Sequence, residues 1–191
     1  MKFLWTAALG ACVLAGCASK GAPPQVRQGV AEGGAKTISV APAKVACEAA
    51  SAACPVLAAA WNSAKARQAV LIVGLPGQQA GVTGADFHMT DAGTIRLRLP
   101  SRGPAPALGY PATAFDVPLA AVSQIAYGQR SWVRVYLAGG RAVDENINSG
   151  DQTGEVTQTL SYFLAAVQDA GVEGANARGK GGLFDMFGGD D

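Results

Sequence analysis

Few residues in this chain are of the types that carry out enzymatic chemistry. His88 is the only histidine among 191 residues, no G-x-S-x-G sequence accompanies it, and FHM around it is typical of an ordinary strand. A zinc site would need three or four ligands. The neighbouring acids Asp144–Glu145 and Asp190–Asp191 suit exposed turns, because sequence neighbours do not flank a substrate bond. We therefore expect no catalytic residue, no metal and no cofactor, and a protein that is not an enzyme.

The segment DENINSGDQTGE, from Asp144 to Glu155, comes close to a calcium-binding pattern. Asp, Asn and Asn stand at every second position and Glu stands twelfth, which resembles an EF-hand loop. The sixth position is Ser149, where the sharp turn of that loop needs glycine, and a predicted strand precedes the segment in place of a helix. Asp, Asn, Ser and Gly also favour turns and helix caps. We expect a turn that leads into a helix, with calcium binding as the alternative.

The N-terminal sequence MKFLWTAALGACVLAGCASK has the organisation of an export signal. Lys2 supplies a positive charge, and the apolar stretch Phe3–Leu14 is shorter than a membrane-spanning helix. Leu14-Ala15-Gly16-Cys17 matches the lipobox, so this segment resembles the bacterial lipoprotein family. The resemblance implies a signal peptide cleaved before Cys17, diacylglyceryl transfer to the Cys17 thiol and acylation of the new amino group, palmitate being a typical chain. The alternative is an ordinary signal peptide with a chance cysteine.

The same resemblance implies a location. Several acyl chains anchor a protein stably in a membrane. Ala18 and Ser19 follow the cysteine, whereas an Asp there would resemble an inner-membrane retention signal. The expected location is therefore the outer membrane, with the domain facing the periplasm; exposure on the cell surface is the alternative.

Two further cysteines remain in the exported chain. Cys12 leaves with the signal peptide, and a remaining pair in an oxidising compartment usually bonds. On a continuous helix Cys47 and Cys54 would lie about 10.5 Å apart along the axis, beyond the about 7 Å that a disulfide spans. Pro55 also biases Cys54 away from helical angles. A disulfide-closed loop is predicted; a short helix with two free thiols is the alternative.

Composition divides the chain into four parts. Residues 1–16 are the expected signal peptide, 17–36 the lipidated cysteine and a flexible tether, 37–170 a single domain, and 171–191 a Gly-rich disordered tail. The net charge of +1 gives no electrostatic reason to expect a nucleic-acid partner. The expected partners are the membrane, through Cys17, and an envelope protein.

Strand patterns dominate the predicted domain, and one amphipathic helix ends it. The helix follows from apolar spacing between Val156 and Val167, a capping box of Ser149 with Gln152, and a stop at Gly171. The expected strands are 56–61, 69–75, 85–89, 94–99, 115–117, 122–127, 132–137 and 141–143, with one helical turn allowed at 119–121. This order predicts an α+β fold, a mostly antiparallel sheet in a roll or partial barrel that the C-terminal helix closes. The stretch FDVPLAAVSQIAYGQRSWVRVYLAGG before that helix resembles the end of a PH-like domain, and the resemblance implies no binding residues.

Two strands carry a candidate interaction surface. Period-two alternation places Arg96 and Arg98 on one face of their strand, and Trp132, Arg134 and Tyr136 on one face of theirs. If both strands belong to one sheet, a cationic and aromatic surface results, suited to anionic lipid, glycan or a protein. The alternative is a solvated outer sheet face.

The tail carries a second candidate. Apolar residues among glycines suggest a docking motif for a partner, and folding back onto the domain is the alternative; these residues are Leu183, Phe184, Met186 and Phe187. Together the features predict a lipid-anchored envelope protein without catalytic activity, which acts as a periplasmic interaction or assembly subunit. The alternative is a binding module for a lipid, glycan or other small ligand, and a hydrolase is the least favoured.

Overall fold

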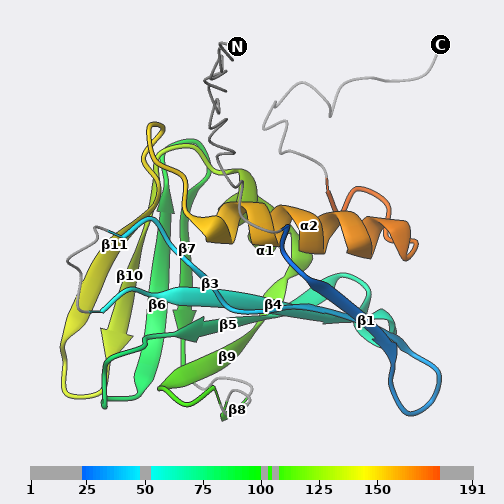
Figure 1. Cartoon of the computed structure of the whole chain (residues 1–191), viewed down its shortest axis with the longest axis horizontal. Coiled ribbons are helices and arrows are strands. Elements are labelled where there is room, and N and C mark those ends of the chain that lie inside the picture. Colours follow the sequence, from blue (N-terminus) through cyan, green and yellow to red (C-terminus); the bar gives the residue numbers. More distant parts are fainter. Residues whose placement is uncertain (1–22, 48–52, 100–102, 105–107, 177–191) are drawn as a thin grey trace, which may run out of the picture.

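The part of the chain that the structure describes folds into two antiparallel sheets and two α-helices. The computed structural model describes residues 23–47, 53–99, 103–104 and 108–176. Both helices lie on one side of the larger sheet, and the smaller sheet stands at one end like an adjoining wall (Figure 1). The elements in order are β1 (Val26–Val30), β2 (Lys36–Val40), β3 (Ala43–Lys44), β4 (Val56–Asn62), the 3₁₀ turn η1 (Ser63–Lys65), β5 (Gln68–Gly74), β6 (Val82–Met89), β7 (Gly93–Arg98), β8 (Gly103–Pro104), β9 (Ala112–Pro118), α1 (Leu119–Tyr127), β10 (Ser131–Leu137), β11 (Ala142–Asn148) and α2 (Glu155–Asp169).

The strand order separates a large sheet from a small sheet. The large sheet has seven strands in the order β1-β2-β4-β5-β9-β8, with β3 also paired to β4, and the small sheet has the order β11-β10-β6-β7. The predicted α+β class and the terminal helix that follows the strands are confirmed. In the described part of the chain the sheets stay open and do not close into a barrel.

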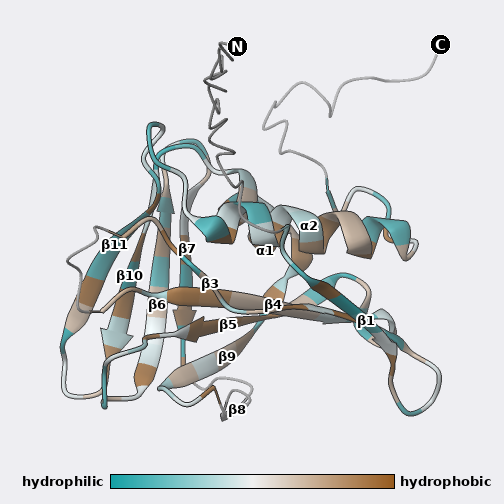
Figure 2. Cartoon of the chain, viewed as in Figure 1, coloured by the Kyte–Doolittle hydropathy of each residue, from teal (hydrophilic) through white to brown (hydrophobic). Residues whose placement is uncertain are grey.

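The core fills the space that the two sheets and the helices enclose. Apolar residues gather along β4 and β5 under α2 (Figure 2). Alternate residues of β4 point into this core, among them Leu57 and Trp61, and Phe87 and Val133 reach it from the small sheet. The predicted apolar stripe of α2 is fully buried; its residues are Val156, Leu160, Phe163, Leu164 and Val167. Most of the stability of this helix comes from the burial of its apolar stripe.

The segment 122–127 is a helix, and its assignment as a strand was wrong. Helix α1 runs from Leu119 to Tyr127, and the buried residues Leu119, Val122 and Ile125 recur every third position along it. The β-branched Val122 and Ile125 favour strands locally, but packing of this face against α2, β5 and β9 decides the outcome. The helix lies within the stretch that resembles the end of a PH-like domain.

The ordered domain begins earlier than its composition suggests. Strand β1 lies within the segment 17–36, which was expected to be a flexible tether. It is ordered because it pairs along its length with β2. The lipobox with Cys17 and the tail residues Leu183, Phe184, Met186 and Phe187 lie outside the described residues. Neither helix in the described part is long and apolar enough to cross a membrane.

The start of α2 differs from the predicted capping box. Gly154 is the N-cap and no side chain caps the helix. Ser149 instead accepts a hydrogen bond from the backbone N–H of Gln152 at 3.0 Å, in the turn before the helix. The helix ends where expected, since Gly171 follows it with φ +108°.

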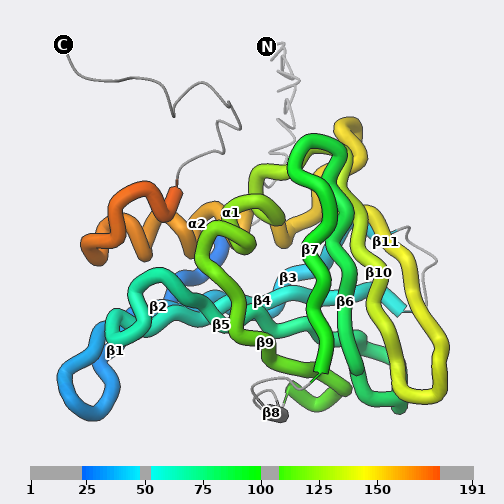
Figure 3. Tube along the Cα trace, turned by 180° about the vertical axis from the view of Figure 1, so that it is seen from behind, coloured from blue at the N-terminus to red at the C-terminus, as the bar shows by residue number. Residues whose placement is uncertain are grey.

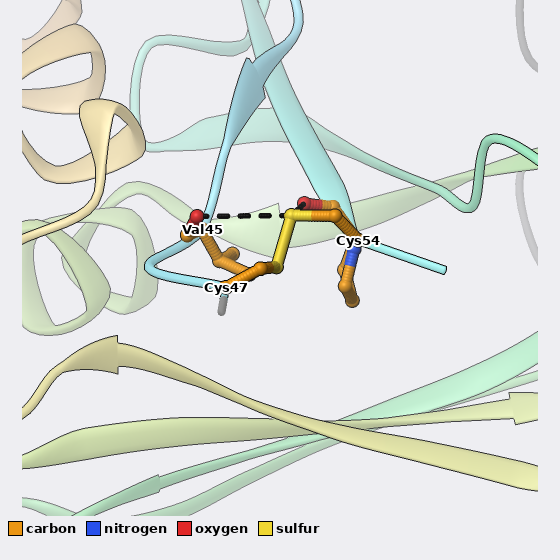
Figure 4. Close-up of a disulfide and its surroundings, with 4 residues drawn as sticks. Val45, Cys47 and Cys54 are labelled. Atoms are coloured by element: carbon orange, nitrogen blue, oxygen red, sulfur yellow. Dashed lines mark hydrogen bonds between the residues drawn. A yellow bond between two sulfur atoms is a disulfide. The ribbon is translucent and has the colours of Figure 1, made fainter. Parts of the chain in front are cut away.

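The predicted disulfide joins Cys47 to Cys54 (Figure 4), with the two Cα atoms 5.8 Å apart. Beside it the backbone N–H of Val45 donates to Pro55 at 3.1 Å, and the N–H of Ala46 donates to Asn146 of β11 at 2.8 Å. The segment that leads into the bridge therefore connects the large sheet, through β3 and β4, with the small sheet. Loss of the disulfide should loosen this connection.

Replacing both Cys47 and Cys54 with alanine should lower the free energy of unfolding by about 2 kcal/mol, because the unfolded chain regains the entropy of an open loop. Urea unfolding of the wild type, with and without reductant, and of the double variant measures the effect. Reductant should destabilise the wild type alone. A wild type that unfolds at the same urea concentration in both conditions would show that the bridge contributes nothing.

Candidate functional site

The solvent side of the small sheet carries the candidate site. Trp132, Arg134 and Tyr136 of β10 point away from the core, while the residues between them are buried. Strand β6 lies between β10 and β7, and its residue Asp86 faces Arg134 on one side and Arg96 on the other. We call this surface the outer face; it consists of Gly84, Asp86, His88, Thr94, Arg96, Arg98, Trp132, Arg134, Tyr136, Asp144 and Asn146. All five residues predicted from the sequence lie on it.

Asp86 lies at the centre of the outer face and is only 6% exposed. Both of its carboxylate oxygens accept hydrogen bonds from the Arg98 guanidinium, at 2.5 and 2.9 Å. The Tyr136 hydroxyl donates a third bond at 2.8 Å. The bonds from Arg98, more than any other contact, hold the pKa of Asp86 below its ordinary value of 3.8, although burial acts in the opposite direction. The charged carboxylate is thus fully partnered.

A glycine makes this arrangement possible. Gly84 of β6 lies in register between Tyr136 and Arg98, and the Arg98 guanidinium lies 4.5 Å from the centre of the Tyr136 ring. A Cβ atom at position 84 would be 2.6 Å from the Leu97 carbonyl oxygen and 3.3 Å from Cδ of Arg98. Because Gly84 has no side chain, Arg98 can extend across β6 and reach Asp86 and Tyr136.

A second group surrounds Trp132. Its ring stacks on that of His88 at 3.9 Å with planes 9° apart, and Nδ1 of His88 lies 3.1 Å from Oγ1 of Thr94. Arg134 lies 5.6 Å from the centre of the Trp132 ring and bonds Asp144 through two contacts of 2.7 and 2.6 Å. These bonds lower the pKa of Asp144. Stacking on His88 and the neighbouring ion-paired Arg134 therefore order Trp132.

The charge of the outer face differs from the expected cationic surface. Arg98 and Arg134 are each neutralised by an aspartate on a neighbouring strand. Arg96 is exposed, and no ion pair joins it to any residue that the structure describes. The face is therefore a nearly neutral aromatic and polar surface with one available guanidinium.

The role of the residues that organise this face was not predicted from the sequence. His88 was assigned as an ordinary strand residue and Asp144 as a turn acid, and Asp86 and Gly84 were not singled out. A signal did exist, because Gly84, Asp86 and His88 alternate with Ala85 and Phe87 in the GADFH segment. Their partners could not be found in the same way, since the sequence does not show that β6 separates β7 from β10.

The segment Asp144–Glu155 does not have the geometry of an EF-hand loop. Asp144 and Asn146 lie in strand β11, and the side-chain oxygen of Asn148 accepts a bond from the backbone N–H of Gly150 at 2.9 Å. Within the described ranges, no group of three or more His, Cys, Asp or Glu residues could hold a metal ion. The segment is a strand followed by a turn into α2.

Comparison with known proteins adds no relative. No family model, no curated protein and no solved structure matches this chain. The geometry of the outer face is therefore the basis on which a function is assigned.

Proposed function

We propose that this protein is a lipid-anchored subunit of the cell envelope that binds another envelope protein and catalyses no reaction. Its binding surface is the outer face of the small sheet. The observation that carries this proposal is the ordered set of Trp132, Tyr136, Arg98 and Arg134 on that face. Trp, Tyr and Arg are the residues most enriched at the energetic centres of protein interfaces.

The order of these side chains supports binding. Side chains that are mobile before association lose conformational entropy when they are fixed in an interface. Here hydrogen bonds to Asp86 and Asp144 already hold Arg98, Arg134 and Tyr136. The surface therefore needs little rearrangement, and Arg96 remains available for a carboxylate of the partner.

The expected anchor places this surface near a membrane. Cys17 of the lipobox is six positions before Pro23, the first described residue, and this separation spans at most about 20 Å of extended chain. A domain held at this distance meets partners that are embedded in, or bound to, the same membrane. A membrane-associated protein is accordingly the expected partner.

In-cell photo-crosslinking of the full-length chain tests the proposal. A photoreactive residue at Trp132 should give one discrete crosslinked species, whereas the same residue at Tyr162, an exposed aromatic residue of α2, should not. Arg96→Glu should reduce that species about tenfold, because it reverses the charge that faces the partner. The matched control is Arg27→Glu, since Arg27 is exposed on β1 at the edge of the large sheet.

The anchor is tested in the same cells. Cys17→Ser should abolish the incorporation of labelled palmitate and the crosslinked species together. Equal crosslinking from positions 132 and 162, or a species that Arg96→Glu leaves unchanged, would exclude the outer face as the binding surface. A Cys17→Ser variant that still incorporates palmitate would exclude Cys17 as the lipid anchor.

A further inference from the structure

Both helices lie on one side of the large sheet (Figure 3). Residues of its other side line a groove. The groove has a volume of about 510 Å³ and crosses β2, β4, β5 and β9. Its side chains alternate with those of the core: Ala60 and Val70 line the groove, while Ala59 and Leu71 face the helices. The volume falls in the range of sites that bind small organic ligands.

The strand register gives this groove a polar end and an apolar end. At the polar end Thr37 pairs with Asn62, and Gln68 follows on β5. The middle row runs through Ser39, Ala60, Val70 and Asp116. The last row is apolar and consists of Ala58, Ile72 and Ala114, which pair across three strands. The groove is therefore polar at one end and apolar at the other, and Asp116 is the charged residue of the middle row.

Small side chains keep the groove open. Ala60 and Ala114 extend only a methyl group above the sheet, so the surface between their neighbours is recessed. At the apolar end Leu108 packs against the cluster of Ala58, Ile72 and Ala114. A slender apolar ligand fits such a floor better than a bulky ring or a second sheet, whose side chains would need more depth.

The charges at the rim indicate the head group of the ligand. Lys65 lies at the polar end beside Asn62, and it forms no ion pair with any residue in the described part of the chain. Asp116 lies across the middle row, where it has an interaction of its own. An anion at the polar end would meet an available ammonium group, with the backbone and side chains of Thr37 and Asn62 nearby.

We propose that this groove binds a long-chain fatty acid. The carboxylate lies at the polar end beside Lys65, and the alkyl chain follows Ala60 and Val70 toward Ile72 and Ala114. Buried CH₂ groups supply most of the affinity, and the charge of Lys65 fixes the direction of the ligand. Fatty-acid binding in the groove is independent of the outer face, which belongs to the small sheet.

Photo-labelling of the full-length lipidated protein in nanodiscs tests this assignment. The probes are palmitate and hexadecanol that carry a photoreactive group near the end of the chain, and labelled peptides are identified by mass spectrometry. Palmitate should label peptides that contain Ile72 or Ala114, and excess unlabelled palmitate should remove the label. Labelling spread over the protein surface, or a label that unlabelled palmitate does not displace, would overturn the proposal.

Three variants separate the chain from the head group. Ala60→Leu fills the groove from its floor and should reduce labelling by both probes at least about tenfold. The control Ala142→Leu, at an exposed position of β11, should leave the labelling unchanged. Lys65→Gln should weaken palmitate labelling about threefold and leave hexadecanol labelling unchanged. Circular dichroism verifies folding, and Val70→Phe repeats the filling test if Ala60→Leu does not fold. Equal labelling of a folded filled variant and the wild type would exclude the groove.

Discussion

Replacing Gly154 with alanine should lower the free energy of unfolding by about 3 kcal/mol, one of the largest effects expected of a single methyl group in this domain. The added Cβ would lie 2.6 Å from the backbone nitrogen of Ala46 and 2.7 Å from the carbonyl carbon of Val45. Both contacts are with backbone, which cannot rotate away as a side chain would. The backbone of Gly154 has φ −68° and ψ 155°, values that any residue can adopt. The glycine is therefore required by close packing and not by its dihedral angles.

The position of Gly154 explains the size of this effect. Its N–H donates to the Ile147 carbonyl oxygen at 3.0 Å, so it connects β11 with the first turn of α2. The same residues 45 and 46 lead into the disulfide, and the N–H of Ala46 bonds to Asn146. A shift that relieves the contact must move the helix start, or must move the segment that joins the two sheets.

Gly81→Ala provides the matched control. Gly81 is exposed, and no atom lies within 4 Å of a Cβ built there, so its substitution should change stability by at most about 0.5 kcal/mol. Urea unfolding of the three proteins measures the difference. If Gly154→Ala is as stable as Gly81→Ala, α2 does not pack on residues 45–46 as described.

Local patterns predicted much of this fold, because alternation and apolar spacing directly reflect which side of an element is buried. They located most strands and the stripe from Val156 to Val167, and the Cys47–Cys54 bridge followed from export chemistry and spacing. They failed at α1, where Val122 and Ile125 favour a strand locally and tertiary contacts impose a helix. They also could not show that β1 pairs with β2, since that segment has little apolar content and is ordered by backbone hydrogen bonds.

The site was less predictable than the fold. Period two placed Arg96, Arg98, Trp132, Arg134 and Tyr136 on strand faces, as the structure shows. The pairing of Arg98 with Asp86 depends on strand order and on the missing side chain of Gly84, and neither is a property of a local segment. For this reason the sequence overestimated the positive charge of the surface and did not reveal the carboxylate that organises it.

Replacing Asp86 with alanine should lower the free energy of unfolding by about 2 to 3 kcal/mol, because three hydrogen bonds to a buried charged group are lost together. Asp144→Ala is the matched control on the same face. Asp86 has 8% of its side chain exposed and Asp144 has 48%, although each bonds an arginine through two contacts. Exposed ion pairs contribute little, so the control should change stability much less. Equal effects at the two positions would show that burial of Asp86 does not matter.

Lowering the pH should weaken the same interaction, because protonation removes the charge of the Asp86 carboxylate that Arg98 binds. The pKa of Asp86 in the folded protein lies below its ordinary value of 3.8, chiefly because Arg98 bonds the charged form. Between these two pKa values the unfolded chain binds more protons, so the stabilisation is fully present above pH 3.8 and is lost as the pH falls through the folded value. The pKa of Asp144 is lowered in the same direction by Arg134. Urea unfolding at decreasing pH should therefore show a smaller acid loss in Asp86→Asn than in the wild type. An identical loss in both proteins would mean that the Asp86 carboxylate is bound no better in the fold than in water, which would contradict its bonds to Arg98 and Tyr136.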